Sequence, residues 1–403
     1  MNRSVRTLLA TALVLGIAVG TAGPVSASSP ADGAPGSRPA SGAPRIGDPL
    51  DAEALRAAID GLPRQDAVAA LVRVGGTGGS WRGSAGVHDL PSGRPADPAA
   101  AFRAGSVTKV FTAATVLQLA GERKLSLDRT ARHYLPDLIP AAYGEVTVRQ
   151  LLDHTSGIPA PDLPGENLEE WYAHRFDVHT PRSMVASATA KDREFAPGVS
   201  QHYLNINYTV LGLLIERVTG HAYAQEVAVR ILRPLGLRST CFPGVDPRIR
   251  GPHNRGYQVF AGAGGAVELR DVTVWGATDG WAAGDVISTT ADLERFTTAL
   301  FAGRVVRGPL LEEMFTLPDA SVRTYGSGKP ARYSAGLSVL TLGGRQVWGK
   351  TGGRWGYNTA VAATRDLSRT LVYSVGATDA KGPGMNATAM GLVVAAFGPP
   401  PAA

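Results

Sequence analysis

The sequence of 403 residues has little of several things that would assign it to a well-known class of protein. It has a single cysteine, Cys241, which excludes a disulfide framework and a thiolate-rich metal site. That cysteine is expected to be a small buried side chain rather than a reactive thiol. The chain contains no run of Lys and Arg, and its net charge of +6 is weak grounds for a nucleic-acid partner, so none is expected.

Common catalytic and cofactor-binding motifs are missing as well. There is no His-Glu-x-x-His, and His174 and His179 are five residues apart, off a common helical face, so no metal site is expected. The absence of Gly-x-Ser-x-Gly argues against the nucleophile elbow of an α/β-hydrolase. Neither Gly-x-Gly-x-x-Gly nor a phosphate-binding loop occurs, so no cofactor is expected.

Lysine is scarce, although the overall composition is ordinary. Apolar residues make up 44% of the chain and charged residues 18%, which is typical of a globular protein with a sizeable core. Arginine supplies most of the 40 basic residues, and arginine cannot in practice lose its proton. A lysine is therefore informative where a side chain must act as a base. The six lysines are Lys109, Lys124, Lys191, Lys329, Lys350 and Lys381.

The N-terminal segment has the layout of a secretory signal peptide. Arg3 and Arg6 precede an apolar run at 8–22, and small residues follow, so residues 1–27 are expected to be cleaved after Ala27. The run is short for a membrane span, and no cysteine follows it that could carry a lipid, so no stable membrane anchor is expected. Residues 28–48, mostly Ala, Pro, Gly and Ser, are expected to be a disordered linker. The mature protein is expected to be secreted; the alternative is a cytoplasmic protein with an apolar N-terminal helix.

Residues 49–398 are expected to form one folded domain of the α/β (α+β) class. The order of elements is helix, strands, a long helical middle, strands and helix, and distant strands can share one antiparallel sheet flanked by the terminal helices. A sheet lobe is expected at about 49–135 and 260–398, and a mainly helical lobe at about 136–259, with the site in the groove between them. The expected strands are 67–74, 79–89, 335–342, 345–351, 358–364 and 370–377, and the clearest helices are 106–122, 207–218, 290–301 and 386–397.

The first candidate site is Ser106-Val107-Thr108-Lys109 at the start of a predicted helix. A spacing of three places the Ser106 hydroxyl and the Lys109 amine on one helical face. A serine hydroxyl needs a base to take its proton, and a neutral lysine can be that base. Burial and the positive end of a helix both lower the pKa of a lysine. The alternative is a serine that caps the helix, followed by a solvated lysine.

The second candidate is Tyr203-Leu204-Asn205, just before a predicted helix. In extended backbone, alternate residues point to the same side, so the Tyr203 phenol and the Asn205 amide would face one site. The phenol could relay a proton, and the amide could hold a substrate carbonyl. The alternative is a buried tyrosine beside an asparagine that caps the helix.

The third candidate is Lys350-Thr351-Gly352-Gly353 at the end of a predicted strand. The glycines would let a substrate backbone lie against the strand edge. Lys350 supplies positive charge and Thr351 a hydroxyl donor, which suits a carboxylate. The alternative is a strand that runs into a glycine turn. Each motif alone is weak, but composition would produce all three in one chain at a frequency of only about 0.005.

In this order, Ser-x-x-Lys, Tyr-x-Asn and Lys-Thr-Gly form the pattern of penicillin-recognising serine enzymes. The chain resembles the serine β-lactamase and penicillin-binding protein superfamily, and within it the secreted D-alanyl-D-alanine carboxypeptidases and class C β-lactamases. The resemblance covers about 50–397. Its supporting phrases are Phe102-Arg103-Ala104-Gly105, Leu151-Leu152-Asp153-His154-Thr155-Ser156-Gly157, Gly212-Leu213-Leu214-Ile215-Glu216 and Gly284-Asp285-Val286-Ile287-Ser288-Thr289.

The resemblance implies a role for each candidate residue. Ser106 would be the acylated nucleophile, Lys109 its base and Tyr203 the residue that passes a proton to the leaving group and then helps to activate water. Asn205 would hold the substrate's amide carbonyl. Backbone N–H groups of Ser106 and Gly353 would form the oxyanion hole. The strand residues Lys350, Thr351 and Gly352 would complete the substrate-binding site, with the first two holding a carboxylate.

Two departures from the family pattern weaken the expected specificity for a terminal carboxylate. Near relatives have His-Thr-Gly where this chain has Lys350. Carboxypeptidase relatives tend to place an arginine on the preceding strand, and the matching stretch 336–339 has none. Lys350, Arg354 and Arg345 are the candidates to compensate.

The sequence therefore predicts an exported acyl-serine hydrolase, a D-alanyl-D-alanine carboxypeptidase that is acylated by β-lactams. Its expected partners are peptidoglycan stem peptides or related small acyl substrates, and it is expected to be a monomer. The alternatives are a class C-like β-lactamase or an esterase on the same scaffold. A further alternative is an inert binding protein for penicillin or peptidoglycan, against which the intact Ser106, Lys109 and Tyr203 count.

Overall fold

A computed structural model describes residues 49–165, 167–262 and 266–398 of the chain. The expected signal peptide and linker, at 1–48, lie outside the described residues, so the structure does not test them. Within the described part of the chain, no helix has the length and apolar character needed to cross a membrane.

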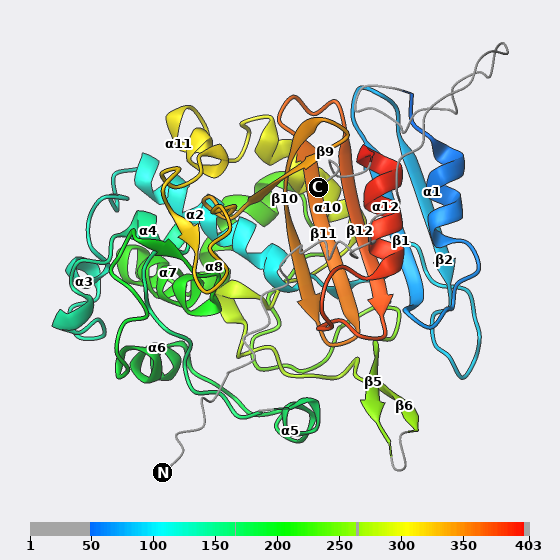
Figure 1. The fold of residues 1–403 in the computed structure, drawn as a ribbon, viewed down its shortest axis with the longest axis horizontal. Coiled ribbons are helices and arrows are strands. Elements are labelled where there is room, and N and C mark those ends of the chain that lie inside the picture. The colour runs from blue at the N-terminus through cyan, green and yellow to red at the C-terminus, as the bar shows by residue number, and fades with distance from the viewer. Residues whose placement is uncertain (1–48, 166, 263–265, 399–403) are drawn as a thin grey trace, which may run out of the picture.

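A six-stranded antiparallel sheet is the centre of the fold (Figure 1). Its strands follow the order β2-β1-β12-β11-β10-β9, so the first strands of the chain lie beside the last. Val72 of β1, for example, pairs with Tyr373 of β12. Distant strands therefore share one sheet, as the sequence predicts. The strands are β1 (Ala67–Gly75), β2 (Trp81–Gly86), β9 (Ser338–Leu342), β10 (Arg345–Arg354), β11 (Tyr357–Thr364) and β12 (Thr370–Ala377).

The two terminal helices, α1 (Ala52–Ile59) and α12 (Ala387–Phe397), cover one face of this sheet. Asn386 accepts a hydrogen bond from the backbone N–H of Ala389 and so caps α12 at its start. Leu55 and Leu392 are fully buried in the apolar layer that joins these helices to the strands. The arrangement confirms the predicted layer of terminal helices on one face.

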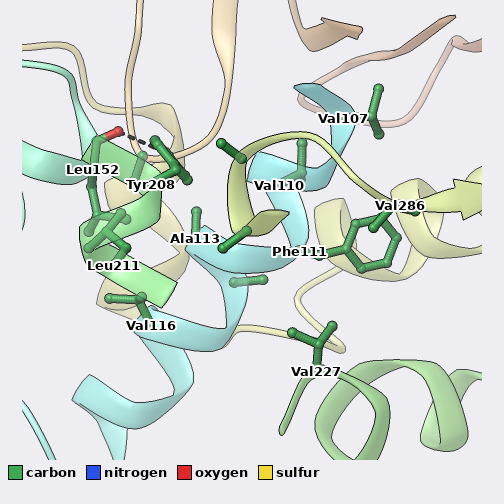
Figure 2. Packing of buried hydrophobic residues seen from close by; sticks show 14 of the residues in the cluster. Val107, Val110, Phe111, Ala113, Val116, Leu152, Tyr208, Leu211, Val227 and Val286 are labelled. Atoms are coloured by element: carbon green, nitrogen blue, oxygen red, sulfur yellow. Dashed lines mark hydrogen bonds between the residues drawn. The ribbon is translucent and has the colours of Figure 1, made fainter. Parts of the chain in front are cut away.

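Helix α2 (Thr108–Gly121) lies on the other side of the sheet, in the larger core (Figure 2). Nearly all of its side chains are buried because it packs against α7 (Asn205–Thr219) and α10 (Thr290–Phe301). Phe111 of α2 stacks on Phe296 of α10, with ring centroids 3.8 Å apart. The remaining helices are α3 (Ala131–Tyr134), α4 (Val148–Leu152), α5 (Leu168–Ala173), α6 (Pro181–Thr189), α8 (Tyr223–Val227), α9 (Arg233–Leu235) and α11 (Pro309–Glu312).

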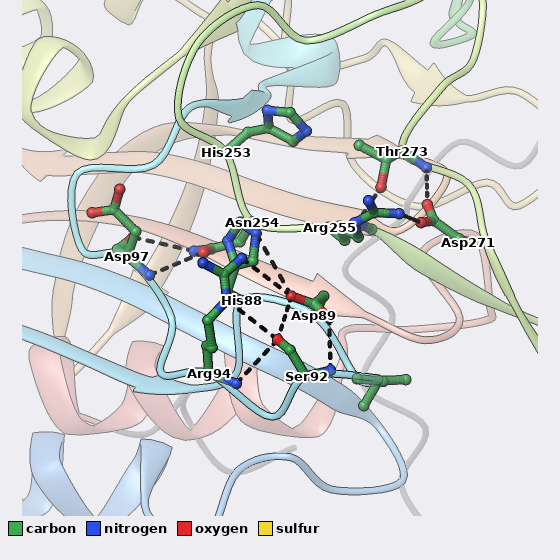
Figure 3. A network of polar contacts seen from close by, with 12 residues as sticks. His88, Asp89, Ser92, Arg94, Asp97, His253, Asn254, Arg255, Asp271 and Thr273 are labelled. Atoms are coloured by element: carbon green, nitrogen blue, oxygen red, sulfur yellow. Dashed lines mark hydrogen bonds and ion pairs between the residues drawn. The ribbon is translucent and has the colours of Figure 1, made fainter.

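A network of polar contacts holds the loops beside the turn between β10 and β11 (Figure 3). Asn254 exchanges two hydrogen bonds with the backbone of Asp97, at 3.0 and 3.1 Å. Arg255 forms an ion pair with Asp271. The carbonyl of Asn254 in turn accepts a hydrogen bond from the Tyr357 hydroxyl at 3.0 Å. The network thus holds the start of β11, which pairs with the end of β10 where the third candidate motif lies.

The structure differs from the sequence-based predictions in several places. β10 continues to Arg354, past the predicted end, because the glycines pair with β11 rather than leaving the sheet. A separate hairpin of β5 (Tyr257–Ala261) and β6 (Val267–Asp271), which was not predicted, falls across the expected lobe boundary near 259. Cys241 is exposed, so its expected burial is wrong. Its backbone bonds to Ile287, which holds the main chain at the surface and leaves the thiol outside the core.

Candidate active site

Ser106 lies in a single helical turn (Gly105–Val107) that leads directly into α2. Gly105 has a φ of +52°, a conformation that a residue with a Cβ rarely adopts. The Thr108 hydroxyl donates to the Gly105 carbonyl at 2.7 Å and accepts from the N–H of Val286 at 3.0 Å. These bonds tie the turn to the neighbouring segment, so the Ser106 side chain is held in place by the backbone around it.

Lys109 is completely buried and has three hydrogen-bonding neighbours. Its Nζ lies 3.2 Å from Ser106 Oγ, 2.7 Å from Asn205 Oδ1 and 2.8 Å from the carbonyl oxygen of Ala283. A neutral amine has two N–H donors and one lone pair. The amide and carbonyl oxygens can only accept, so they take both donors and leave the lone pair for the Ser106 hydroxyl. The structure thus brings Ser106, Lys109 and Asn205 into contact.

The surroundings of Lys109 favour its neutral form. Burial lowers the pKa of Lys109 well below its ordinary value, and the charges of Lys350 and Lys381 lower it further. No carboxylate forms an ion pair with Lys109 in the part of the chain that the structure describes. Lys109 can therefore accept the proton of the neighbouring serine, as a general base must.

Tyr203 is surrounded by aromatic rings and lysine side chains. Its ring stacks on Tyr333 with centroids 4.6 Å apart, and the His154 ring lies 4.5 Å away. Lys350 Nζ and Lys109 Nζ lie 4.6 and 4.9 Å from the centre of the same ring. The phenol is thus placed near the lysines of both the first and the third motif.

The Tyr203 phenol is held in its neutral form. Burial raises the pKa of Tyr203 well above its ordinary value, and Tyr333 raises it further, while the Ser106 hydroxyl lowers it in part. The hydroxyl oxygen is buried and makes no well-aligned hydrogen bond to any of the described residues, although Ser106 is near enough to affect its pKa. A protonated phenol that is free to rotate its O–H can donate to an incoming group.

The end of β10 presents an open edge to the site. β9 pairs with β10 only up to Gly349, opposite Ser338, so 350–354 has no strand partner on that side among the described residues. The Ser338 hydroxyl donates to the Gly349 carbonyl at 3.1 Å, so this carbonyl faces the β9 side. Because strand residues alternate, Thr351 and Gly353 direct their N–H and C=O groups to the same edge. That edge can accept an extended substrate.

Three glycines bring the strand and the serine turn into direct backbone contact. A Cβ on Gly352 would lie 2.0 Å from the Ala104 carbonyl oxygen and 3.0 Å from the backbone nitrogen of Ser106. A Cβ on Gly105 would lie 2.8 Å from the nitrogen of Gly353. The N–H groups of Ser106 and Gly353 therefore come from two segments in contact, as an oxyanion hole requires.

Lys350 is buried and already hydrogen-bonded, unlike a side chain that is free to bind a carboxylate. Its Nζ donates to the carbonyl of Thr351 at 2.9 Å, and burial lowers the pKa of Lys350 to about 7. The two arginines proposed to compensate are not available. Arg354 donates to both oxygens of Asp279, at 2.8 and 2.9 Å, and Arg345 is at the opposite end of β10.

Several neighbours of the site were not predicted as functional residues. The Ala283 carbonyl accepts from Lys109 through its backbone, which no side-chain pattern reveals. Tyr333 comes from an irregular segment before β9, and its place beside Tyr203 depends on the fold. Lys381 follows β12, and its Nζ donates to the Gly353 carbonyl at 3.0 Å. The only signal for Lys381 was the scarcity of lysine.

Three more residues, His154, Trp355 and Tyr357, lie around the site. His154 is buried and packs against Tyr203 and Tyr208. Tyr357 is a core residue, whereas Trp355 is partly exposed beside Lys381. Among the described residues, no group of three or more His, Cys, Asp or Glu side chains is placed to hold a metal ion.

Comparisons with known proteins place this geometry in a family. A family model described as beta-lactamase matches residues 55–395. Among solved structures, a D-stereospecific amidohydrolase from Streptomyces sp. is similar, with a TM-score of 0.73 and 30% identity, over 86% of this chain and 98% of that one. A D-amino acid amidase from Ochrobactrum anthropi, with a TM-score of 0.72 and 23% identity over 85% and 97% of the two chains, shares the fold.

Curated relatives match parts of the chain. The esterase EstB of Burkholderia gladioli is 33% identical over 228 residues, which are 51% of this chain and 57% of the esterase. Penicillin-binding protein 4* of Bacillus subtilis is 27% identical over 299 residues, which are 72% of this chain and 64% of that protein. The chain thus spans less than two thirds of either relative. The family model nevertheless covers most of the sequence and includes all three motifs. This chain belongs to the beta-lactamase family, within the superfamily of serine β-lactamases and penicillin-binding proteins.

Proposed function

We propose that the protein is an acyl-serine hydrolase that acts as a D-alanyl-D-alanine carboxypeptidase on peptidoglycan-type peptides. The observation that carries the proposal is the hydrogen bonding of Lys109. Its amine gives its two donors to Asn205 and Ala283 and directs its lone pair at the hydroxyl of Ser106. A serine with a buried, neutral base beside it is an activated nucleophile.

The reaction follows from the positions of these groups. As Ser106 Oγ attacks the carbonyl carbon, its proton moves to Lys109 Nζ and the carbonyl oxygen becomes an oxyanion. The N–H groups of Ser106 and Gly353 stabilise that oxyanion, and each such donor is typically worth a few kcal/mol of barrier. When the C–N bond breaks, Tyr203 passes a proton to the leaving amine and recovers one from Lys109. Water then attacks the acyl-enzyme by the same route and releases the acid.

Export belongs to the proposal and is supported only by the sequence at 1–27. Cleavage after Ala27 would leave Ser28 as the first residue of the secreted protein. N-terminal sequencing of protein recovered from the culture medium tests this. A first residue at Met1, with the protein retained in the cells, would contradict it.

The decisive experiment is intact-mass analysis after exposure to penicillin, with Ser106→Ala as the control. A lasting adduct on the native protein only, together with release of D-alanine from an N-acylated D-Ala-D-Ala peptide, is the expected result. Rapid return to the unmodified mass would instead indicate a β-lactamase. Ester hydrolysis that depends on Ser106 but leaves no adduct would indicate an esterase. Identical behaviour of the native and Ser106→Ala proteins would exclude the mechanism.

One observation favours a second candidate, an amidohydrolase for D-aminoacyl amides. Arg354 is occupied by Asp279 and Arg345 is remote, so neither of the two arginines proposed to compensate is placed to bind a terminal carboxylate. The D-stereospecific amidohydrolase from Streptomyces sp. is the similar structure with the greatest coverage given above. Comparing kcat/KM for a D-aminoacyl amide with that for the corresponding D-Ala peptide separates the two, because only the peptide carries the carboxylate.

A further inference from the structure

Lys381 lies at the active site and enters the steps described above only through its charge, which helps to lower the pKa of Lys109. It follows β12 by four residues, is partly exposed, and its Nζ lies 3.0 Å from the Gly353 carbonyl oxygen and 5.8 Å from the centre of the Trp355 ring. Among the described residues, no carboxylate forms an ion pair with it, because Arg354 takes both oxygens of Asp279. Lys381 therefore brings to the open edge of β10 a positive charge that has no ion pair of its own, although the more distant Asp279 favours its charged form.

The carbonyl that Lys381 contacts is one that a substrate would use. Gly353 directs both its N–H and its C=O to the open edge. In a hydrogen-bonded antiparallel pair, two opposite residues exchange both bonds. An aminoacyl residue whose carbonyl oxygen accepts from the Gly353 N–H therefore offers its own α-N–H to the Gly353 carbonyl. A carbonyl oxygen has two lone pairs, so it can accept from the substrate and from Lys381 together.

The charge on the substrate's α-nitrogen then decides whether this nitrogen and Lys381 Nζ can both donate to the Gly353 carbonyl oxygen. Two donors on one carbonyl oxygen lie roughly 4 to 5 Å apart at ordinary hydrogen-bond distances. A free amino acid derivative carries an ammonium group at that position, which Lys381 repels. An N-acylated derivative has a neutral amide N–H there and is not repelled. A carboxylate at the far end of the N-acyl group would be attracted.

We propose that Lys381 is a specificity-determining residue, which selects N-acylated D-aminoacyl substrates, above all those with an anionic acyl group, over substrates with a free α-ammonium group. This rests on the proposed function, because it requires Ser106 to attack an aminoacyl carbonyl at the Gly353 edge. Burial lowers the pKa of Lys381 to about 8, so the side chain is mostly charged at neutral pH.

Three matched p-nitroanilides test the proposal: D-alanyl, N-acetyl-D-alanyl and N-succinyl-D-alanyl p-nitroanilide. The readout is the ratio of kcat/KM values, with the uncharged N-acetyl compound as the reference. In Lys381→Met, whose apolar stem can still pack on Trp355, the relative rate for the free-amine substrate should rise about tenfold. The relative rate for the succinyl substrate should fall. Lys381→Arg, which keeps the charge, should retain the native ratios.

Two further measurements keep the test independent of folding defects. Lys381→Gln provides a second uncharged variant, and Lys329→Met removes an exposed lysine that lies outside the site and should leave the ratios unchanged. In the native protein, high salt should shrink the discrimination, because it screens partly exposed charges. Ratios that stay within twofold in both uncharged variants would overturn the role of Lys381 and leave Ser106-dependent hydrolysis standing. No Ser106-dependent turnover of any of the three would overturn this inference, and it would overturn the proposed function as well if no D-alanine is released from the D-Ala-D-Ala peptide.

Discussion

Two buried basic side chains of the site, Lys109 and Arg354, differ in whether a carboxylate lies beside them. Arg354 meets the carboxylate of Asp279 with two hydrogen bonds. Burial alone would lower the pKa of Arg354, but Asp279 outweighs burial and the pKa is raised. Lys109 meets only uncharged oxygens, and burial lowers its pKa well below the ordinary value. Burial is similar in the two places, so the presence of a carboxylate decides which group stays charged and which is shifted toward the neutral form that the proposed base requires.

The comparison predicts its largest effect for Lys109→Arg, which makes the base permanently charged. We expect kcat/KM to fall by about 10³- to 10⁴-fold, the usual contribution of general-base catalysis, because arginine has no lone pair to accept the proton of Ser106. Steady-state kinetics on an N-acylated D-aminoacyl ester measures this. Lys124→Arg, at an exposed position, is the matched control. Activity within tenfold of native in the folded Lys109→Arg protein would break the comparison.

Removing the charge of Arg354, which Asp279 compensates, should affect the stability of the protein. Arg354→Met leaves Asp279, whose side chain is only partly exposed, without its ion-pair partner, and the free energy of unfolding should fall by up to about 3 kcal/mol. Urea denaturation measures the change. Arg345→Met, at the exposed end of the same strand, should cost less than about 0.5 kcal/mol. The double variant Arg354→Met/Asp279→Leu should recover most of the loss, and failure to recover would show that the ion pair is not what holds this region.

A smaller effect is expected when Lys109 is given a neighbouring carboxylate, as Arg354 has in Asp279. Asn205→Asp places a carboxylate where an amide oxygen now lies 2.7 Å from Lys109 Nζ. The ammonium form of Lys109 is then favoured, so the acid limb of the kcat/KM profile should move up by about one to two pH units. Activity at pH 7 should fall by about 10- to 100-fold and recover partly in alkaline buffer. Asn205→Ala should lose activity without moving the limb upward, which separates charge from the lost hydrogen bond.

The smallest expected effect is on stability and concerns Lys350. Like Lys109, this buried lysine forms no ion pair with a carboxylate among the described residues. Its folded pKa of about 7 is below the value of a free lysine. Between those values the unfolded chain binds a proton that the folded protein has lost, so the free energy of unfolding rises with pH. Lys350→Met should remove this share, at most about 1.4 kcal/mol over one pH unit between pH 8 and 9. Chemical denaturation at the two pH values measures it, and an unchanged slope would show that Lys350 stays charged in the fold.

Much of the architecture could be predicted because it depends on local patterns. The helix at Thr290–Phe301 has the predicted bounds, since its apolar side and its cap lie within one segment. The convergence of Ser106, Tyr203 and Lys350 was implied by the family pattern, and the structure brings them together. The chemical role of each residue stays a prediction until variants are assayed.

The remaining features depend on contacts between distant segments. The pairing of Arg354 with Asp279 joins positions 75 residues apart, so the sequence could offer Arg354 as a free carboxylate ligand. The acceptor at Ala283 is a backbone atom and leaves no mark in the pattern of side chains. Lys381 meets Gly353 only because β10 and the segment after β12 lie side by side in the folded sheet.

The contact of Gly105 and Gly352 with the opposite backbone has a consequence for redesign. No side chain separates the serine turn from the strand, so the spacing of the two proposed oxyanion donors is fixed by main-chain atoms alone. Substitutions elsewhere can reshape the walls around a substrate, whereas this spacing has no side chain through which it can be tuned. Directed evolution toward bulkier acyl groups should therefore accumulate changes around Trp355, Tyr333 and Lys381 and leave the glycines untouched.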